Sequence, residues 1–245
     1  MKDEIKLISL FQETIQKSQE DCGKRLNEMS NVYEMLPLSF IHIIENNSES
    51  TKYLDSLLYW CYMESYRIIS HTIYLSYCGL YRNAFDNIRH FLESIMQATY
   101  IDINHPKEKI ETKLAILKEI EKAREYHTKN LFENKIDFKK LKCEGVDCKG
   151  LINKEYRKLS KIVHPSSEKV FITIDDVAES KGIPVTIDCE EISRIFNSLI
   201  ITYNIFYFLL IAHFPEIIKP LNNNAELKKF IKKHHLYLID KILKK

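Results

Sequence analysis

Residues 77–96 read YCGLYRNAFDNIRHFLESIM, and this stretch decides the fold because it contains the turn between two long helical patterns. An aromatic-rich pattern with helical spacing covers 51–77 before the turn, and a second one covers 80–102 after it. Gly79 is the glycine that commonly stands just past the end of a helix. Since the connection is so short, we expect the two helices to pack as antiparallel neighbours.

Helical spacing continues over most of the remaining chain. The five glycines and six prolines in 245 residues are too few for an all-β protein that turns every ten residues or so. The sequence therefore predicts an all-α fold, a multi-helix bundle in a single domain, with one small β-hairpin within 170–188 as the only strand it would allow. Further helices are expected at 3–30, around 40–44, at 106–133 starting from Pro106, at 151–164, at 189–214 and at 224–243, with a loop at 134–150.

The most apolar run, LIITYNIFYFLLIAHF at 199–214, contains no Asp, Glu, Lys or Arg. It is shorter than the roughly 20 residues of a membrane-spanning helix, and Asn204 and His213 interrupt it. Apolar positions upstream continue the helical spacing between charged residues, which favours a buried central helix. The chain opens on an amphipathic pattern rather than a signal sequence, so we expect a cytoplasmic protein without a membrane partner.

The six cysteines give little sign of a metal site. Only Cys143 and Cys148 form a close pair, and no second pair stands nearby to complete a zinc site. A local disulfide between these two cysteines remains an alternative, although disulfides inside cells are expected mainly in hyperthermophiles. Several of the other cysteines fall on apolar helix faces, where a thiol behaves as a small hydrophobic group. The sequence thus predicts neither a metal nor another cofactor.

Basic charge is concentrated in two segments, although the net charge of the whole chain is only +2. Residues 139–161 and residues 224–245 each carry a net charge of +5. Together they could form a face that attracts phosphate groups. The alternative is that lysine-rich segments of this kind are simply solvated.

Residues 156–165, YRKLSKIVHP, place Arg157 seven positions before His164 at the end of an expected helix. Seven residues make almost two turns, so both side chains and Ser160 between them should share one face. An arginine that grips a phosphate beside a histidine that moves a proton suffices to cleave RNA without a metal. Nearby lysines would bind the phosphate chain: Lys154, Lys158 and Lys161. The alternative is that His164 only caps helix carbonyls.

Chemically, RNA supplies its own nucleophile, the 2′-hydroxyl. Arg157 could hold two phosphate oxygens in a bidentate manner. The negative end of the helix dipole at His164 favours the protonated imidazole, and Pro165 should turn His164 out of helical geometry. Ser160 could donate to phosphate or hydrogen-bond back to the Tyr156 carbonyl.

A second group of charges lies on the helix expected at 80–102. Arg82 and Arg89 are seven residues apart, and Glu93 follows Arg89 by four, within reach of an intrahelical ion pair. Arg89 and Glu93 fall at the border of the apolar face, where charges usually pair with another helix. These three residues therefore have either a structural pairing role or a supporting role at the active site.

The combination of Tyr-Arg-Asn-Ala-Phe…Arg-His-Phe-Leu-Glu-Ser at 81–94 with Tyr-Arg-x-Leu-Ser-x-x-Val-His-Pro-Ser at 156–166 resembles a branch of the HEPN superfamily. The resemblance covers about 50–214, flanked by a helical extension at 1–49 and the basic helix at 224–245. It implies a helical bundle from a prokaryotic defence or toxin–antitoxin system.

In active members of this superfamily, an Arg and a His with four to six residues between them line a cleft between two protomers and cut RNA without metal, and Arg157 and His164 match this spacing at its upper limit. The resemblance thus implies a homodimer, single-stranded RNA as substrate, and a nucleotidyltransferase or antitoxin as a further partner. The residue after the arginine is often Asn, Asp or His in active members and is Lys158 here. Two alternatives therefore stay open: an inactive binding module and a purely structural helical protein.

Overall fold

The protein is an all-α bundle, as the sequence predicts. The computed structural model describes residues 2–38, 40–41, 53–123, 128–141, 147–164 and 187–244, with side chains from Gln12 onward. Of these residues 87% are helical, and none of them forms a strand. The expected hairpin within 170–188 lies outside the described residues except for Ile187 and Asp188, and so does the 42–44 part of the short helix.

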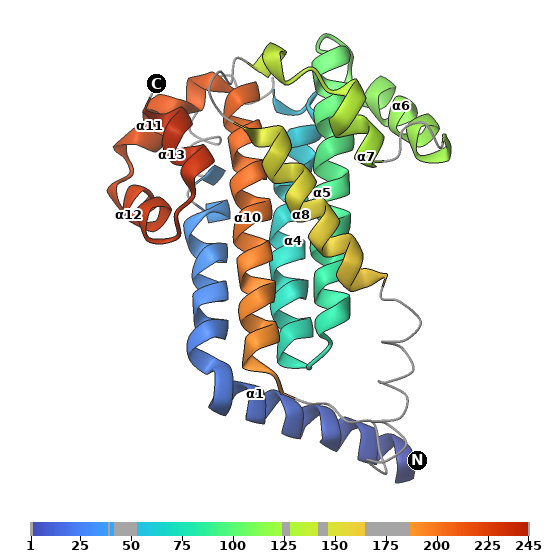
Figure 1. The fold of residues 1–245 in the computed structure, drawn as a ribbon, viewed down its shortest axis with the longest axis vertical. Helices are drawn as coiled ribbons and strands as arrows, with labels where there is room; N and C mark the ends of the chain where they lie inside the picture. Colours follow the sequence, from blue (N-terminus) through green and yellow to red (C-terminus); the bar gives the residue numbers. More distant parts are fainter. Residues whose placement is uncertain are drawn as a thin grey trace.

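Helices α4 (Leu57–Tyr77) and α5 (Tyr81–Asn104) form the predicted antiparallel pair (Figure 1). Gly79 adopts a φ of 69°, in the left-handed region that only glycine enters without strain. The amide of Leu80 donates to the carbonyl of Leu75 (2.8 Å) and that of Gly79 donates to Ser76 (3.2 Å). These two bonds are the Schellman closure of a helix end, so the glycine both ends α4 and reverses the chain.

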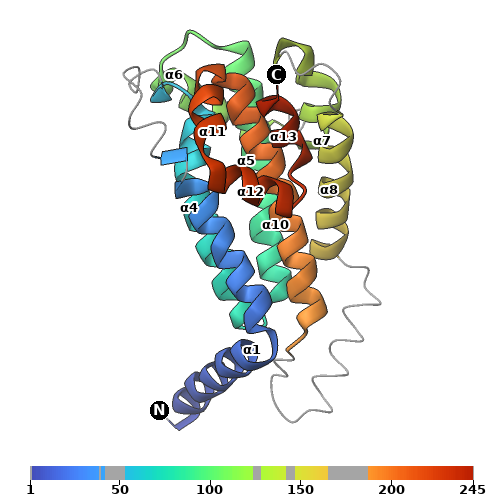
Figure 2. The ribbon, with the colours of Figure 1, turned by 90° about the vertical axis from the view of Figure 1, so that its left-hand side faces the viewer.

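The helix at the centre of the bundle is α10 (Cys189–His213), which packs against α4, α5 and α1 (Lys2–Met35). Figures 1 and 2 show α1 bent, with its second half alongside α10 and its first half projecting from the end of the bundle. Among the described residues, α10 alone is long and apolar enough to span a membrane, and 83% of its apolar window is buried inside the protein. Aromatic contacts such as Phe91 with Tyr203, 5.5 Å between ring centroids, account for this burial.

A buried ion pair joins α4, α5 and α6 (Ile110–Lys122). The Lys113 Nζ lies 2.8 Å from the Asp102 carboxylate, and both side chains are almost fully buried. The same carboxylate accepts hydrogen bonds from the Ser56 hydroxyl and from the Leu57 and Leu58 amides at the start of α4. These bonds satisfy the amides that a helix N-terminus leaves without an intrahelical acceptor.

The helix expected at 106–133 is broken, and it does not begin at Pro106. Helix α6 starts at Ile110, whose amide donates to the Asp55 carboxylate, while Lys109 forms an ion pair with the same group. This tertiary contact fixes the helix start four residues later than the proline suggested. After Ala123 the described chain continues as short pieces: α7 (Thr128–Asn130), the π-helix η2 (Leu131–Lys135) and the 3₁₀ helix η3 (Phe138–Leu141).

The basic helix expected at 224–243 is two helices, α12 (Ala225–Lys233) and α13 (Tyr237–Leu243). Between them His235 takes a φ of 52°, and the chain changes direction there. The reason is burial, because both helices have apolar residues to cover, including Phe230 in α12 and Ile239 in α13. The helical pieces η4 (Pro215–Ile217) and α11 (Ile218–Asn223) precede this pair.

Candidate functional site: a basic cleft and the end of the motif helix

The motif helix is α8 (Cys148–Val163), which crosses α5 and α10 obliquely (Figure 1). It begins three residues earlier than expected because the Asp147 carboxylate accepts from the Gly150 amide (2.7 Å) and caps the first turn. At the other end, the Arg82 guanidinium donates to the Val163 carbonyl through two nitrogens (3.1 and 2.7 Å). Arg82, expected to support the site, thus caps the last turn of α8.

Arg157 lies on the solvent-facing side of α8, with lysines on one flank of the helix and uncharged polar side chains on the other. At about 100° per residue, Lys154, Lys158 and Lys161 fall on one side of Arg157, and Tyr156 and Ser160 fall on the other. Arg157 is 62% exposed, and its nearest carboxylate, Glu133, lies 4.0 Å away. So long and exposed an ion pair is weak and leaves the guanidinium available to a ligand.

The lysine flank of α8 and the first turns of α10 enclose a cleft of about 770 Å³. Five cationic side chains line it: Lys154, Arg157, Lys158, Lys161 and Arg194. Glu191 is the acidic residue on its wall and forms an ion pair with Arg194. We call this the basic cleft. Its lining carries a net charge of +4, which attracts anions.

Lys158 has a second task besides lining the cleft. Its Nζ donates to the Ser198 hydroxyl of α10 (2.8 Å) and lies 3.8 Å from the buried carboxylate of Glu155. Burial raises the pKa of Glu155, and the nearby charge of Lys158 only partly offsets this. Lys158 therefore stabilises the contact between α8 and α10. Replacing it would lower the stability of the fold as well as remove a positive charge from the cleft.

His164 points away from the basic cleft and contacts α5. Its Nε2 lies 2.8 Å from a terminal nitrogen (Nη1) of Arg89. Because a guanidinium only donates hydrogen bonds, Nε2 accepts in this contact, which requires the ring hydrogen of His164 to be on Nδ1. The sequence did not suggest Arg89 as the partner of His164.

Arg89 is held in place by carboxylates of its own helix. Its Nε donates to the Glu93 carboxylate (3.1 Å), Asp86 lies 3.8 Å away, and only 16% of the Arg89 side chain is exposed. The sequence left open a structural pairing role and a supporting role for Arg89 and Glu93. The structure contains the intrahelical ion pair of the first role. In addition, Arg89 contacts the motif helix through His164.

Tyr156 and Ser160 lie on the same flank as His164. The pKa of Tyr156 is raised mainly by burial and also by the charge of Glu93, whereas Arg89 and a hydrogen bond from Ser160 act in the opposite direction. We call Arg89, Glu93, Tyr156, Ser160 and His164 the His164 cluster. Tyr156 was missed as a site residue, although its spacing of four from Ser160 would have shown that they share a face.

The structure therefore separates residues that the sequence placed together. Arg157 and the three lysines line the basic cleft, whereas Ser160 and His164 are not among its lining residues. No hydrogen bond or ion pair joins Arg157 to His164 within the described chain. The prediction that these two side chains bracket one phosphate stays a prediction. His164 follows the last helical residue and has left helical geometry, with φ −112° and ψ 70°, as expected.

No cluster of three or more His, Cys, Asp or Glu side chains suited to a metal ion occurs in the described parts of the chain. Cys148 is buried at the start of α8, and Cys143 lies outside the described residues. Comparisons of the chain with models of known families, with curated proteins and with solved structures find no significant match.

Proposed function

We propose that this protein binds single-stranded RNA along the basic cleft, as a HEPN-like protein of the cytoplasm. The observation that carries the proposal is the convergence of five cationic side chains from α8 and α10 on one cleft. Phosphates supply most of the binding free energy of single strands through such cations, and exposed arginine adds bidentate contacts. Arg157 fits this role because of its exposure and its weak pairing with Glu133.

Fluorescence anisotropy with a labelled single-stranded RNA tests the proposal. Replacing Lys154, Arg157 or Lys161 by Gln is expected to weaken binding and to lower the slope of log K against log salt by roughly 0.7 per lost phosphate contact. Lys122→Gln on α6 is the matched control, since Lys122 is exposed and remote from the cleft lining. Equal affinity and salt slope in all four variants would refute RNA binding in the cleft. A duplex RNA of the same length tests the preference for single strands.

The contact of His164 with Arg89 favours a second candidate function, metal-independent cleavage of the bound RNA. When the Arg89 guanidinium turns from Nε2 to a phosphate oxygen, Nε2 is free to take the proton of a 2′-hydroxyl while the 2′-oxygen attacks phosphorus, and the guanidinium stabilises the charge on the phosphorane. The leaving 5′-oxygen needs a proton from a second group. We include a homodimer in the proposal because the partner's imidazole, in its protonated form, could supply this proton.

Cleavage is tested with labelled RNA in the presence of EDTA. We expect His164→Ala and Arg89→Met to abolish cleavage with little change in binding, and Arg157→Ala to lose mainly binding. Light scattering on the same samples tests the dimer. If His164→Ala retains wild-type cleavage, the catalytic proposal fails. Binding without any cleavage would indicate an inactive module that works with a nucleotidyltransferase or antitoxin, and the absence of both would leave a structural protein.

A further inference from the structure

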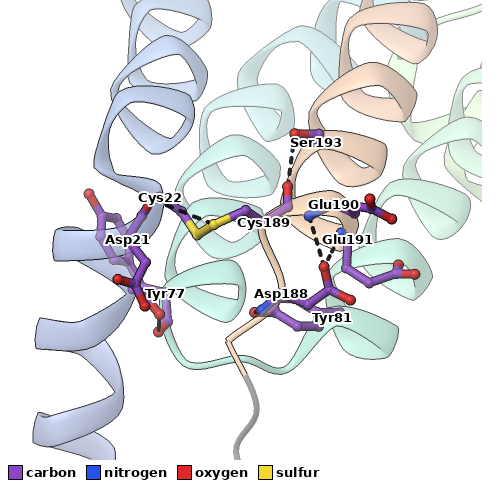
Figure 3. Close-up of a disulfide and its surroundings, with 10 residues drawn as sticks. Asp21, Cys22, Tyr77, Tyr81, Asp188, Cys189, Glu190, Glu191 and Ser193 are labelled. Carbon is purple, nitrogen blue, oxygen red and sulfur yellow. Dashed lines mark hydrogen bonds between the residues drawn. A yellow bond between two sulfur atoms is a disulfide. The ribbon is translucent and has the colours of Figure 1, made fainter.

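A disulfide connects two helices at the end of the bundle (Figure 3). It joins Cys22 in α1 to Cys189, the first residue of α10, across 167 residues of sequence, with 5.6 Å between the two Cα atoms. The sequence did not suggest this pair, since the two cysteines are remote along the chain. Their meeting depends on α1 lying alongside α10.

One of the two cysteines of the disulfide is exposed. Cys189 is exposed, whereas Cys22 is only 4% exposed, and both line a cavity of about 270 Å³ together with Asp21, Lys24 and Arg25. Thiol–disulfide exchange requires a thiolate to reach one sulfur in line with the S–S bond. Cys189 is the exposed residue of the pair, so we expect a thiolate to attack its sulfur rather than that of Cys22.

The helix that begins at Cys189 also forms one wall of the basic cleft. Glu191 and Arg194, which face α8 across the cleft, follow Cys189 by two and five residues, so both lie within the first two turns of α10. The disulfide therefore links α1 to the start of α10, and the start of α10 positions Arg194.

Few other contacts hold the first turn of α10. The Asp188 amide donates to the Tyr81 hydroxyl (2.8 Å), and Asp188 caps the helix locally. Cys189 and Glu190 are exposed, and firm burial begins at Ile192. Helix ends with few buried contacts open locally at low free energy. The covalent bond is thus a main restraint on this turn.

We propose that Cys22–Cys189 is a reversible thiol–disulfide exchange site that controls the basic cleft, with a dithiol as its reductant. A thiolate of the dithiol attacks the Cys189 sulfur, and the S–S electron pair leaves on the Cys22 sulfur, which takes a proton. The second thiol then attacks the mixed disulfide, releases Cys189 as a thiol and oxidises the dithiol to a disulfide. In a reducing compartment such bonds are usually transient and redox-sensing, which suits a disulfide with one exposed cysteine beside a ligand site.

The test compares the oxidised protein with the protein treated with dithiothreitol, using two readouts. Hydrogen–deuterium exchange of amides 188–196 reports the start of α10 without any ligand, and anisotropy with labelled RNA reports the cleft. On reduction we expect faster exchange at 188–196 and weaker RNA binding, with a salt slope smaller by roughly 0.7, the loss of one phosphate contact. The effect on binding rests on the proposed function, whereas the exchange readout does not.

Variants separate the disulfide from other thiols. The double variant Cys22→Ser/Cys189→Ser, with folding checked by circular dichroism, should behave as the reduced protein and ignore dithiothreitol. Cys61→Ser keeps the disulfide and should respond like the wild type.

Three outcomes would overturn the proposal in whole or in part. It is overturned if alkylation and mass spectrometry of the unreduced protein find no linked Cys22–Cys189 peptide, or if reduction leaves exchange at 188–196 unchanged. Faster exchange with unchanged RNA affinity overturns control of the cleft. If RNA binds in neither state, the proposed function fails, and the exchange readout alone decides whether the disulfide controls the start of α10.

Discussion

Single residues in this protein take their roles from partners that lie far away in the sequence. His164 was matched with Arg157 because of their spacing, yet its hydrogen-bond partner is Arg89, 75 residues earlier. Lys113 stands among mostly exposed residues of α6, yet it is buried in an ion pair with Asp102. In both cases the partner comes from another helix.

The Asp102–Lys113 pair supports a prediction on stability. Lys113→Met should destabilise the protein by roughly 3–5 kcal/mol, because it leaves the buried Asp102 carboxylate without its counter-charge. The three remaining donors to that carboxylate favour the lower end of this range. Urea unfolding followed by circular dichroism provides the measurement.

Two controls belong to this experiment. Lys109→Met removes an exposed partner of Asp55 and should change the unfolding midpoint little. Adding Asp102→Asn to Lys113→Met should restore part of the lost stability. A Lys113→Met protein as stable as the wild type would contradict the role assigned to the pair.

At the scale of the element, α8 depends on its contacts more than on its own sequence. Arg82 caps its end, Lys158 bonds to Ser198 of α10, and Glu155 is buried on its inner face with one oxygen lacking a hydrogen-bond partner. Burial with incomplete pairing disfavours the carboxylate, which explains the direction of the Glu155 pKa shift.

This shift predicts how stability depends on pH. Because the pKa of Glu155 in the folded state is raised above its ordinary value of 4.5, the folded protein holds this proton more tightly than the unfolded chain does. Stability from this group is therefore present below pH 4.5 and is lost as pH rises through the folded-state pKa.

Replacing Glu155 by Gln removes the charge that burial disfavours. Glu155→Gln should raise the urea midpoint at pH 7, and the difference from the wild type should disappear as pH falls to about 4.5. Glu121→Gln on the exposed face of α6 is the control and should show no such trend. A lower midpoint for Glu155→Gln at pH 7 would mean that attraction to Lys158 outweighs the cost of burial.

For the whole molecule, the disulfide is a covalent link between distant parts of the chain. It closes a loop of 167 residues, so it restricts the unfolded chain far more than any local contact does. In the chain-entropy description, a loop of that size contributes about 5 kcal/mol to the free energy of unfolding.

Reductive treatment should therefore lower the free energy of unfolding by up to about 5 kcal/mol, with strain or residual structure in the unfolded chain reducing the effect. Urea unfolding with and without dithiothreitol measures this difference. The Cys22→Ser/Cys189→Ser variant should unfold identically under both conditions, whereas Cys61→Ser should still respond. A wild-type urea midpoint that is the same with and without dithiothreitol would contradict the covalent link between α1 and α10.

By itself the sequence determined the all-α fold and the reversal at Gly79, because hydrophobic spacing and the left-handed glycine are local properties of the chain, but it did not predict the breaks within 106–133 and 224–243. It also predicted the burial of α10 and the concentration of cations around α8. Only the tertiary structure decided that His164 meets Arg89, that Arg194 joins the basic cleft and that Cys22 bonds to Cys189. These contacts join residues 75, 33 to 40 or 167 positions apart, and no local pattern encodes which helix faces meet.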